Sequence, residues 1–239
     1  MKQLKIYVFL FALAAVALSS CGLLDQTSPN DIDATDAIKD GASAEAALLG
    51  VYSSMQQSAY YGGQYLLMSE AMSDNAATGG YNVLSLDQLT NRNVTPANLL
   101  GEETWISLYR VVANANNVLA ALPSISDLTA SRKLEIESQT RTLRALAHFD
   151  ALRFYGEHWN ATSAFGVPIV TTPQTISDVP PRSSVAATYT FIVGELNAAY
   201  ANLKATETTP QYVNRNTVAA LLARVYLYQK NNVQAATFA

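Results

Sequence analysis

The sequence predicts an all-α protein in which helical hairpins similar to tetratricopeptide repeats stack as a right-handed array, with long loops and little β-structure. Apolar side chains recur at three- and four-residue steps in several segments, which is the period of one helix face. The 239 residues are 49% hydrophobic and 14% charged. That composition supplies enough apolar surface for a packed core of one or two domains.

The N-terminal residues have the organisation of a secretory signal. Lys2 and Lys5 precede thirteen apolar residues, 6–18, and two serines follow before Cys21. This apolar run is shorter than the roughly 20 residues that span a bilayer. The residues before Cys21, the only cysteine, resemble a bacterial lipobox. We therefore expect residues 1–20 to be a lipoprotein signal peptide and Cys21 to be lipidated, which anchors the chain to a membrane. The alternative is an ordinary signal peptide with an accidental cysteine.

The charge balance argues against nucleic acid as a partner. Without the signal the chain holds 13 basic and 19 acidic residues, a formal charge of −6. Nucleic-acid binding requires concentrated basic surface, whereas the nearest approach to a cluster here is Arg141, Arg144 and Arg153. Two histidines and one cysteine form no metal-ligand cluster, so we expect neither a metal nor a cofactor.

The chain after the signal divides into a tether and a helical domain. Residues 21–41 comprise Cys21 and a polar stretch rich in Asp, Thr and Ser, which predicts an extended tether. Residues 42–239 form the expected helical-repeat domain. Its first helix is expected to be capped by Ser43 and to end near Gln57, and Tyr65–Asp74 forms a second.

The clearest helical period precedes Pro123, a residue that cannot continue a helix. Six apolar side chains share one face: Trp105, Leu108, Val112, Ala115, Leu119 and Leu122. This pattern places Trp105 in the core and does not favour a role as a ligand platform.

The next helix, about 131–155, is apolar over most of its circumference after Leu143, which predicts packing on several sides. Asp150 and Arg153 are three residues apart and can pair along it, while Arg144 and His148 share the remaining polar stripe. We expect structural roles for both pairs. His148 as a general base lacks an accompanying Ser or Cys nucleophile pattern.

Residues 156–181 form a long connection with four prolines and a short β-like stretch at Val167–Val170. Ser183 or Ser184 is expected to cap the helix that follows. Its apolar stripe is Val185, Tyr189, Ile192, Leu196, Ala199 and Leu203.

The last helix is expected to begin near Asn216. One of its faces consists of Val218, Leu221, Leu222, Val225 and Tyr228. The spacing of a tetratricopeptide repeat is matched in part by Leu222, Ala223, Tyr226 and Ala235. Stacked hairpins bury what each of them alone leaves exposed.

Five segments in order resemble the RagB/SusD family of nutrient-uptake outer-membrane lipoproteins. They are the lipobox with LLDQTSP after it, 105–123, RTLRALAHFDALRFYG at 141–156, GVPIV at 166–170 and NTVAALLARVYLYQKNNVQAA at 216–236. The resemblance covers the whole chain but only the N-terminal half of a typical member. It implies that the helical domain is truncated at its C-terminal end, with much of the family's ligand surface beyond it.

The resemblance also implies a function. Family members bind glycans or peptides without cleaving them, and they sit over a TonB-dependent transporter barrel of the SusC type that takes the ligand inward. The expected location is the outer membrane, lipid-anchored and facing the cell exterior. The family often carries several acidic residues after the lipidated cysteine, associated with surface export, whereas residues 22–26 contain only Asp25.

The candidate ligand site is the Gly- and Asn-rich stretch 74–98. Its proposed ligand residues are Asp74, Asn75, Tyr81, Arg92 and Asn93. Planar polar groups hydrogen-bond neighbouring sugar hydroxyls, and an aromatic ring stacks on the apolar sugar face. Turn chemistry selects the same residue types, so an ordinary loop is the alternative. Another set of aromatic residues allows either a stacking arc or helix-end packing: Tyr60, Tyr61 and Tyr65.

Two other function classes compete with nutrient binding. A helical-repeat scaffold lipoprotein that binds a protein or peptide partner fits the repeat pattern equally well. A glycoside hydrolase requires two carboxylates on opposite sides of a cleft. Glu102 and Glu103 are adjacent, and Glu135 and Glu137 are two apart, so neither pair can flank a substrate by itself. We therefore expect no enzymatic activity.

Overall fold

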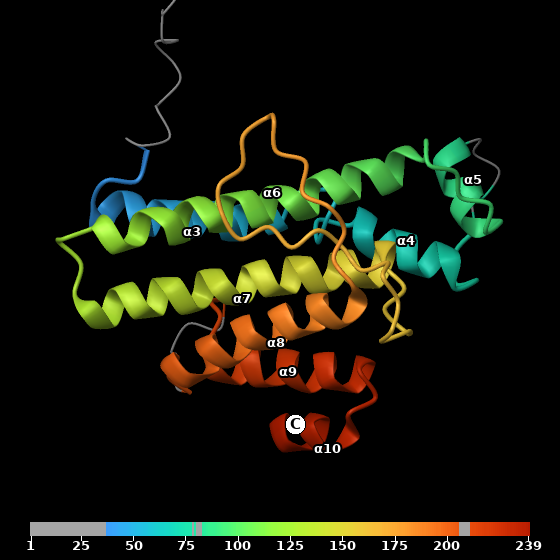
Figure 1. Cartoon of the computed structure of the whole chain (residues 1–239). Coiled ribbons are helices and arrows are strands. Elements are labelled where there is room, and N and C mark those ends of the chain that lie inside the picture. Colours follow the sequence, from blue (N-terminus) through green and yellow to red (C-terminus); the bar gives the residue numbers. More distant parts are fainter. Residues whose placement is uncertain (1–36, 78, 80–82, 206–210) are drawn as a thin grey trace, which may run out of the picture. The chain divides into compact units, whose positions relative to one another are not determined.

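Every regular element in the residues that the structure describes is helical (Figure 1). The structure is a computed structural model that describes residues 37–77, 79, 83–205 and 211–239. The predicted signal peptide, Cys21 and most of the predicted tether lie outside these residues. The elements are α3 (Gly41–Met55), α4 (Gln64–Met72), α5 (Leu84–Thr90), α6 (Leu99–Ala121), the short 3₁₀ turn η2 (Leu122–Ser124), α7 (Ala130–Tyr155), α8 (Val185–Asn202), α9 (Arg215–Tyr228) and α10 (Asn232–Phe238).

Most of the helices form one stack, in which the long helices follow one another in the order α3, α6, α7, α8 and α9, and the short helix α10 packs on α9 (Figure 1). Short connections, 122–129 and 229–231, join α6 to α7 and α9 to α10, so each of these pairs is a hairpin. The two short helices α4 and α5 contact each other and the beginning of α6. The all-α class with stacked hairpins is confirmed. No helix in the described ranges combines the length and apolarity needed to cross a membrane.

Helix α7 lies at the centre and contacts α3, α6, α8 and α9. The prediction that it packs on several sides is confirmed, because buried apolar residues such as Leu143, Phe149 and Ala151 point in different directions around it. The structural role predicted for Arg144 and His148 is confirmed, and the polar stripe that carries them is buried as well. Arg144 and His148 are buried, at 4% and 0% exposure, because α7 has neighbours on that side too.

Neighbouring helices satisfy these buried polar groups. Arg144 donates from Nε to Oε2 of Glu195 on α8 at 2.9 Å, and from a terminal nitrogen to Oδ1 of Asn116 on α6 at 2.7 Å. His148 Nδ1 lies 2.9 Å from the Arg144 carbonyl oxygen. Charge-assisted hydrogen bonds of this kind fix the packing of α6, α7 and α8.

Helix α3 begins three residues earlier than expected, with Asp40 and not Ser43 as its cap. The Asp40 side chain accepts from the Ser43 backbone N–H at 2.8 Å, and Ser43 Oγ accepts from the Asp40 backbone N–H at 3.0 Å. This reciprocal arrangement is a capping box. The expected cap on α8 is confirmed at Ser184, whose hydroxyl accepts from the Ala187 N–H at 3.1 Å.

The predicted apolar stripe of α8 is buried throughout, from Val185 to Leu203. The face of α9 is buried at its centre, where Val218, Leu222 and Val225 are at most 1% exposed.

The β-like stretch Val167–Val170 forms no strand. Its backbone is bound largely by side chains. Tyr109 on α6 donates its hydroxyl to the Pro168 carbonyl at 2.8 Å, and the Val170 N–H lies 3.3 Å from His148 Nε2. This stretch ties the long connection between α7 and α8 to the core.

Candidate functional site

The structure places a helix, α5, inside the stretch 74–98 that the sequence had indicated as one loop. Its only buried residue is Leu89, which packs with Met68 and Ala71 of α4 in a small core of its own. The candidate site is therefore two shorter loops held on either side of α5.

These two loops meet through an ion pair between Asp74 and Arg92. Both residues have left-handed backbone, with φ of 66° and 53°, and their side chains are 72% and 59% exposed. Asn75 donates to Glu70 Oε2 at 2.8 Å. Two of the predicted ligand residues are thus in contact, and their polar groups face solvent.

The remaining predicted ligand residues are placed differently. Asn93 follows Arg92 on the exposed turn after α5, where its backbone N–H donates to the Gln88 carbonyl at 2.9 Å. Tyr81 lies outside the described residues.

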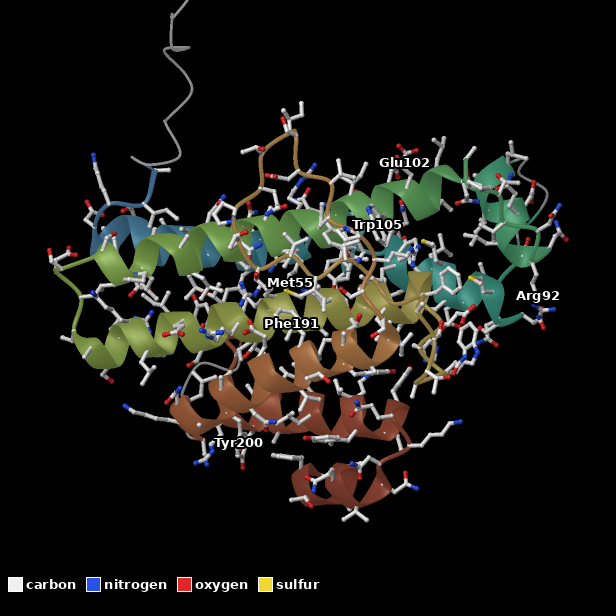
Figure 2. The ribbon with its side chains drawn as sticks, viewed as in Figure 1. Met55, Arg92, Glu102, Trp105, Phe191 and Tyr200 are labelled. Carbon is white, nitrogen blue, oxygen red and sulfur yellow. The ribbon has the colours of Figure 1, made fainter. Side chains whose placement is uncertain are left out.

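A hollow of about 390 Å³ lies against the second loop and the beginning of α6. It is lined by Val94, Thr95, Pro96, Asn98, Gly101, Glu102, Trp105, Tyr155 and Arg182. In Figure 2, Glu102 and Trp105 lie along the part of α6 nearest α5, and Arg92 lies beyond them at the outer edge of α5. We call this hollow the Trp105 groove.

The aromatic wall of the Trp105 groove is held in place by core packing. The Trp105 and Tyr155 rings meet edge to face with centroids 5.0 Å apart, and the Trp105 ring also packs on Tyr109 at 4.6 Å. The Tyr155 hydroxyl donates to the Gly101 carbonyl at 2.7 Å. Burial raises the pKa of Tyr155, so this hydroxyl stays protonated. Trp105 packs against the core, as predicted, but it is only partly buried and also lines the groove.

The polar wall is fixed by Asn98, which caps α6. Its Oδ1 accepts from the Gly101 N–H at 3.0 Å, while its Nδ2 donates to the Ser85 carbonyl at 2.8 Å and to Gln88 Oε1 at 2.9 Å. Asn98 is 3% exposed, so it joins α5 to α6 and is not free for a ligand. The other polar side chains that line the groove are those of Thr95, Glu102 and Arg182. One terminal nitrogen of Arg182 donates to the Tyr155 and Gly166 carbonyl oxygens at 2.9 and 2.7 Å.

The groove combines aromatic faces with a carboxylate and a guanidinium, which suits recognition of a hydroxylated ring. Glu102 is the only carboxylate among the residues that line it. A pair of facing acids, as glycoside hydrolysis requires, is therefore not part of this groove. The sequence pointed to the loop but not to the groove, because Tyr155 and Arg182 reach it from distant segments.

The three tyrosines near the start of α4 pack at a helix end and do not form a stacking arc. All three donate their hydroxyls to the buried Asp150 carboxylate: Tyr60 at 2.6 Å, Tyr61 at 2.8 Å and Tyr65 at 2.6 Å. Asp150 also accepts from Arg153 at 3.1 Å, which confirms the expected pair. No spacing signal could have revealed the tyrosine contacts, since 85 to 90 residues separate the partners.

Residues 23–227 match the model of the SusD-like family described as starch-binding and associating with the outer membrane. The chain belongs to this family. Curated proteins contain no match to the sequence.

Solved structures of SusD-like proteins share the fold. A SusD superfamily protein from Bacteroides thetaiotaomicron VPI-5482 is 26% identical, with a TM-score of 0.73, over 82% of this chain and 44% of its own. A laminarin-binding SusD-like protein is also 26% identical, with a TM-score of 0.71, over 84% of this chain and 42% of its own. A SusD superfamily protein from Bacteroides vulgatus ATCC 8482 is 24% identical, with a TM-score of 0.72, over 84% of this chain and 46% of its own. This SusD-like chain spans less than half the length of these relatives.

Proposed function

We propose that this SusD-like chain is the helical part of a non-catalytic glycan-binding lipoprotein in a TonB-dependent outer-membrane uptake complex. The observation that carries the proposal is the Trp105 groove, which offers aromatic walls and polar groups in a fold whose family is described as starch-binding. A similar solved structure is described as laminarin-binding. In this proposal a sugar ring lies against Trp105 and Tyr155. The Glu102 carboxylate accepts hydrogen bonds from the sugar hydroxyls, and the Arg182 guanidinium donates hydrogen bonds to them.

The exposed pair Asp74 and Arg92 extends this surface to neighbouring sugar residues of the same chain. Each ionic group keeps unused hydrogen-bonding capacity, because both side chains are more than half exposed. Asn75, Asn93 and Tyr81 complete the proposed contacts.

Affinity gel electrophoresis tests the proposal with protein that begins at Gly22. Laminarin and starch are the first polysaccharides to cast in the gels. We expect retardation of the wild type and a several-fold weaker interaction for Glu102→Ala and Arg92→Ala. Arg110→Ala, an exposed change on α6 away from the groove, is the matched control. Equal retardation of all four proteins would contradict the proposed site.

The proposed anchor is a lipid on Cys21, motivated by the lipobox-like residues before it. A producing strain is labelled with an alkyne fatty acid, and wild type is compared with Cys21→Ala. Label on the wild type alone supports anchoring; equal label on both proteins eliminates Cys21 as the attachment site.

The proposed partner is a transporter barrel of the SusC type, with a scaffold that binds another protein as the second candidate function. The loop 171–184 favours a protein contact, because Ile176 and Val179 are 103% and 89% exposed on a turn fixed by Asp178, and the loop projects past α6 (Figure 1). Purification from outer membranes should recover a TonB-dependent barrel with the wild type and less with Ile176→Asp. Recovery of a different protein would favour the scaffold function. If Ile176→Asp recovers as much barrel as the wild type, the loop 171–184 is not part of the interface.

A further inference from the structure

A second hollow, of about 370 Å³, lies where the loop after α7 meets the beginning of α8 and the end of α9. The side chains that define it are His158, Trp159, Tyr189, Tyr228, Gln229 and Lys230. We call it the Trp159 hollow. It shares no lining residue with the Trp105 groove.

The loop that carries Trp159 is ordered by its own hydrogen bonds. The Glu157 N–H donates to the Phe165 carbonyl at 2.9 Å and closes the loop, and the Ser163 hydroxyl donates to Glu157 Oε2 at 2.6 Å. The Val185 N–H donates to the Ser163 carbonyl at 3.0 Å, which fastens the loop to the first turn of α8. Trp159 is nevertheless 63% exposed. A large apolar ring held toward solvent on a fixed loop is typical of a binding surface.

The floor of the Trp159 hollow is aromatic and has an unpaired polar atom. The His158 ring lies 5.3 Å from the Trp159 ring and 5.5 Å from the Tyr228 ring. His158 Nδ1 is buried and has no hydrogen-bond partner among the described residues. Buried polar atoms normally have a hydrogen-bond partner. An unpaired one beside a hollow can therefore form a hydrogen bond with a ligand. Burial and the nearby Arg153 lower the pKa of His158, which is therefore neutral at pH 7.

The charge of the Trp159 hollow is positive. Among the described residues that line it, Lys230 is the only charged one. Lys230 follows α9 with a φ of 61°, and its backbone N–H donates to the Leu227 carbonyl at 3.0 Å, so the point from which its side chain extends is fixed. The Arg153 guanidinium lies over the Tyr228 ring at 5.1 Å, but its charge is paired with the buried Asp150 carboxylate, so Lys230 is the charge that a ligand would meet.

From this combination we infer that the Trp159 hollow binds an acidic sugar residue of a glycan. The pyranose ring stacks on the exposed face of Trp159, and its carboxylate is paired with Lys230. Aromatic stacking supplies the contact area, while the ammonium group selects a uronate over a neutral hexose. This site is separate from the Trp105 groove and does not depend on it.

Titration of polygalacturonate oligomers into the protein that begins at Gly22 tests the inference. We expect binding that weakens as salt is raised, because a charge pair at a partly exposed site is screened. Trp159→Ala and Lys230→Gln are each expected to weaken binding at least tenfold. Phe165→Ala, an equally exposed ring on the same loop but outside the hollow, and Lys204→Gln are the controls, and both should bind as the wild type does. Circular dichroism verifies that each variant keeps its helices.

Three results would overturn the inference. The first is that the wild type does not bind polygalacturonate, and the second is that Phe165→Ala and Trp159→Ala lose equal affinity for it. The third is that Lys230→Gln weakens the binding of neutral oligomers as much as that of acidic ones. The outcome is separable from that of the Trp105 groove. Glu102→Ala should leave polygalacturonate binding unchanged, and Trp159→Ala should leave retardation by laminarin unchanged.

Discussion

Asp150 shows how one residue connects distant parts of this chain. The sequence suggested an ion pair with Arg153 along α7, but the carboxylate is 0% exposed and accepts four hydrogen bonds. Helical spacing predicts neighbours on one helix, and it carries no information about the tyrosines that approach from the α3–α4 connection and the first turn of α4. The pair could therefore be predicted, and its surroundings could not.

Replacement of Asp150 by alanine is expected to lower the free energy of unfolding by about 3–5 kcal/mol, because it leaves Arg153 and three tyrosine hydroxyls without their acceptor. Urea denaturation measures the change. Glu103→Ala, an exposed change on α6, should leave the midpoint almost where it was. Similar midpoints for the two variants would show that the tyrosines find other partners at little cost.

His148 makes stability depend on pH. Burial, with a further effect of the Arg144 charge, lowers the pKa of His148 from 6.5 to about 4. Below pH 6.5 the unfolded chain binds a proton at His148 that the folded chain does not. The contribution of neutral His148 to the free energy of unfolding is therefore fully present above pH 6.5 and is lost as the pH falls toward 4. The difference between the two pKa values corresponds to about 3 kcal/mol of unfolding free energy.

We therefore expect the wild type to lose more stability than His148→Gln between pH 6.5 and 4. Thermal or urea unfolding at several pH values measures both curves, and their difference removes the titration of carboxylates common to the two proteins. Parallel curves would show that His148 is protonated in the folded state without penalty.

Among the elements, the long helices and α4 were predictable, whereas α5 was not. The stripes of α6, α8 and α9 repeat over several turns, so the helical period is unambiguous. Helix α5 has seven residues, one buried side chain and no side-chain cap at Val83. Its stability comes from contact with α4 and α6, which a local pattern does not contain. The groove beside it was missed for the same reason.

Two glycines near α8 should respond to alanine in opposite directions. A Cβ on Gly166 would lie 2.6 Å from the Ser183 carbonyl oxygen and 2.6 Å from Thr188 Oγ1, whereas a Cβ on Gly194 meets nothing within 4 Å. Gly166→Ala should therefore destabilise by about 1–3 kcal/mol through overpacking. Gly194→Ala should stabilise by about 0.5–1 kcal/mol, since alanine loses less backbone entropy in a helix.

Melting temperatures test both predictions: that of Gly166→Ala should be lower than the wild-type value, and that of Gly194→Ala should be higher. A loss of stability in Gly194→Ala would mean that the exposed face of α8 is covered in solution.

At the scale of the whole molecule, protection is expected to decrease from the centre of the stack to its last helix. Helix α7 is buried around its circumference, while α10 has no buried residue among its seven. Hydrogen exchange should therefore be slowest in the middle of α7 and fastest in α10, because local opening follows local burial. Peptide-level mass spectrometry resolves the two helices. Equal protection of α10 and α7 would indicate that another surface covers α10.

The two hollows share one short piece of backbone. Tyr155 lines the Trp105 groove and His158 lines the Trp159 hollow, and three residues of chain span at most about 11 Å. An insertion between them would displace both walls together. Substitutions that change the ligand preference of one hollow alone must therefore lie in its outer wall. The outer wall of the Trp105 groove is 94–96, and that of the Trp159 hollow is 229–230. Sequence variation among close relatives should be tolerated at those outer positions and restricted in length at 155–158.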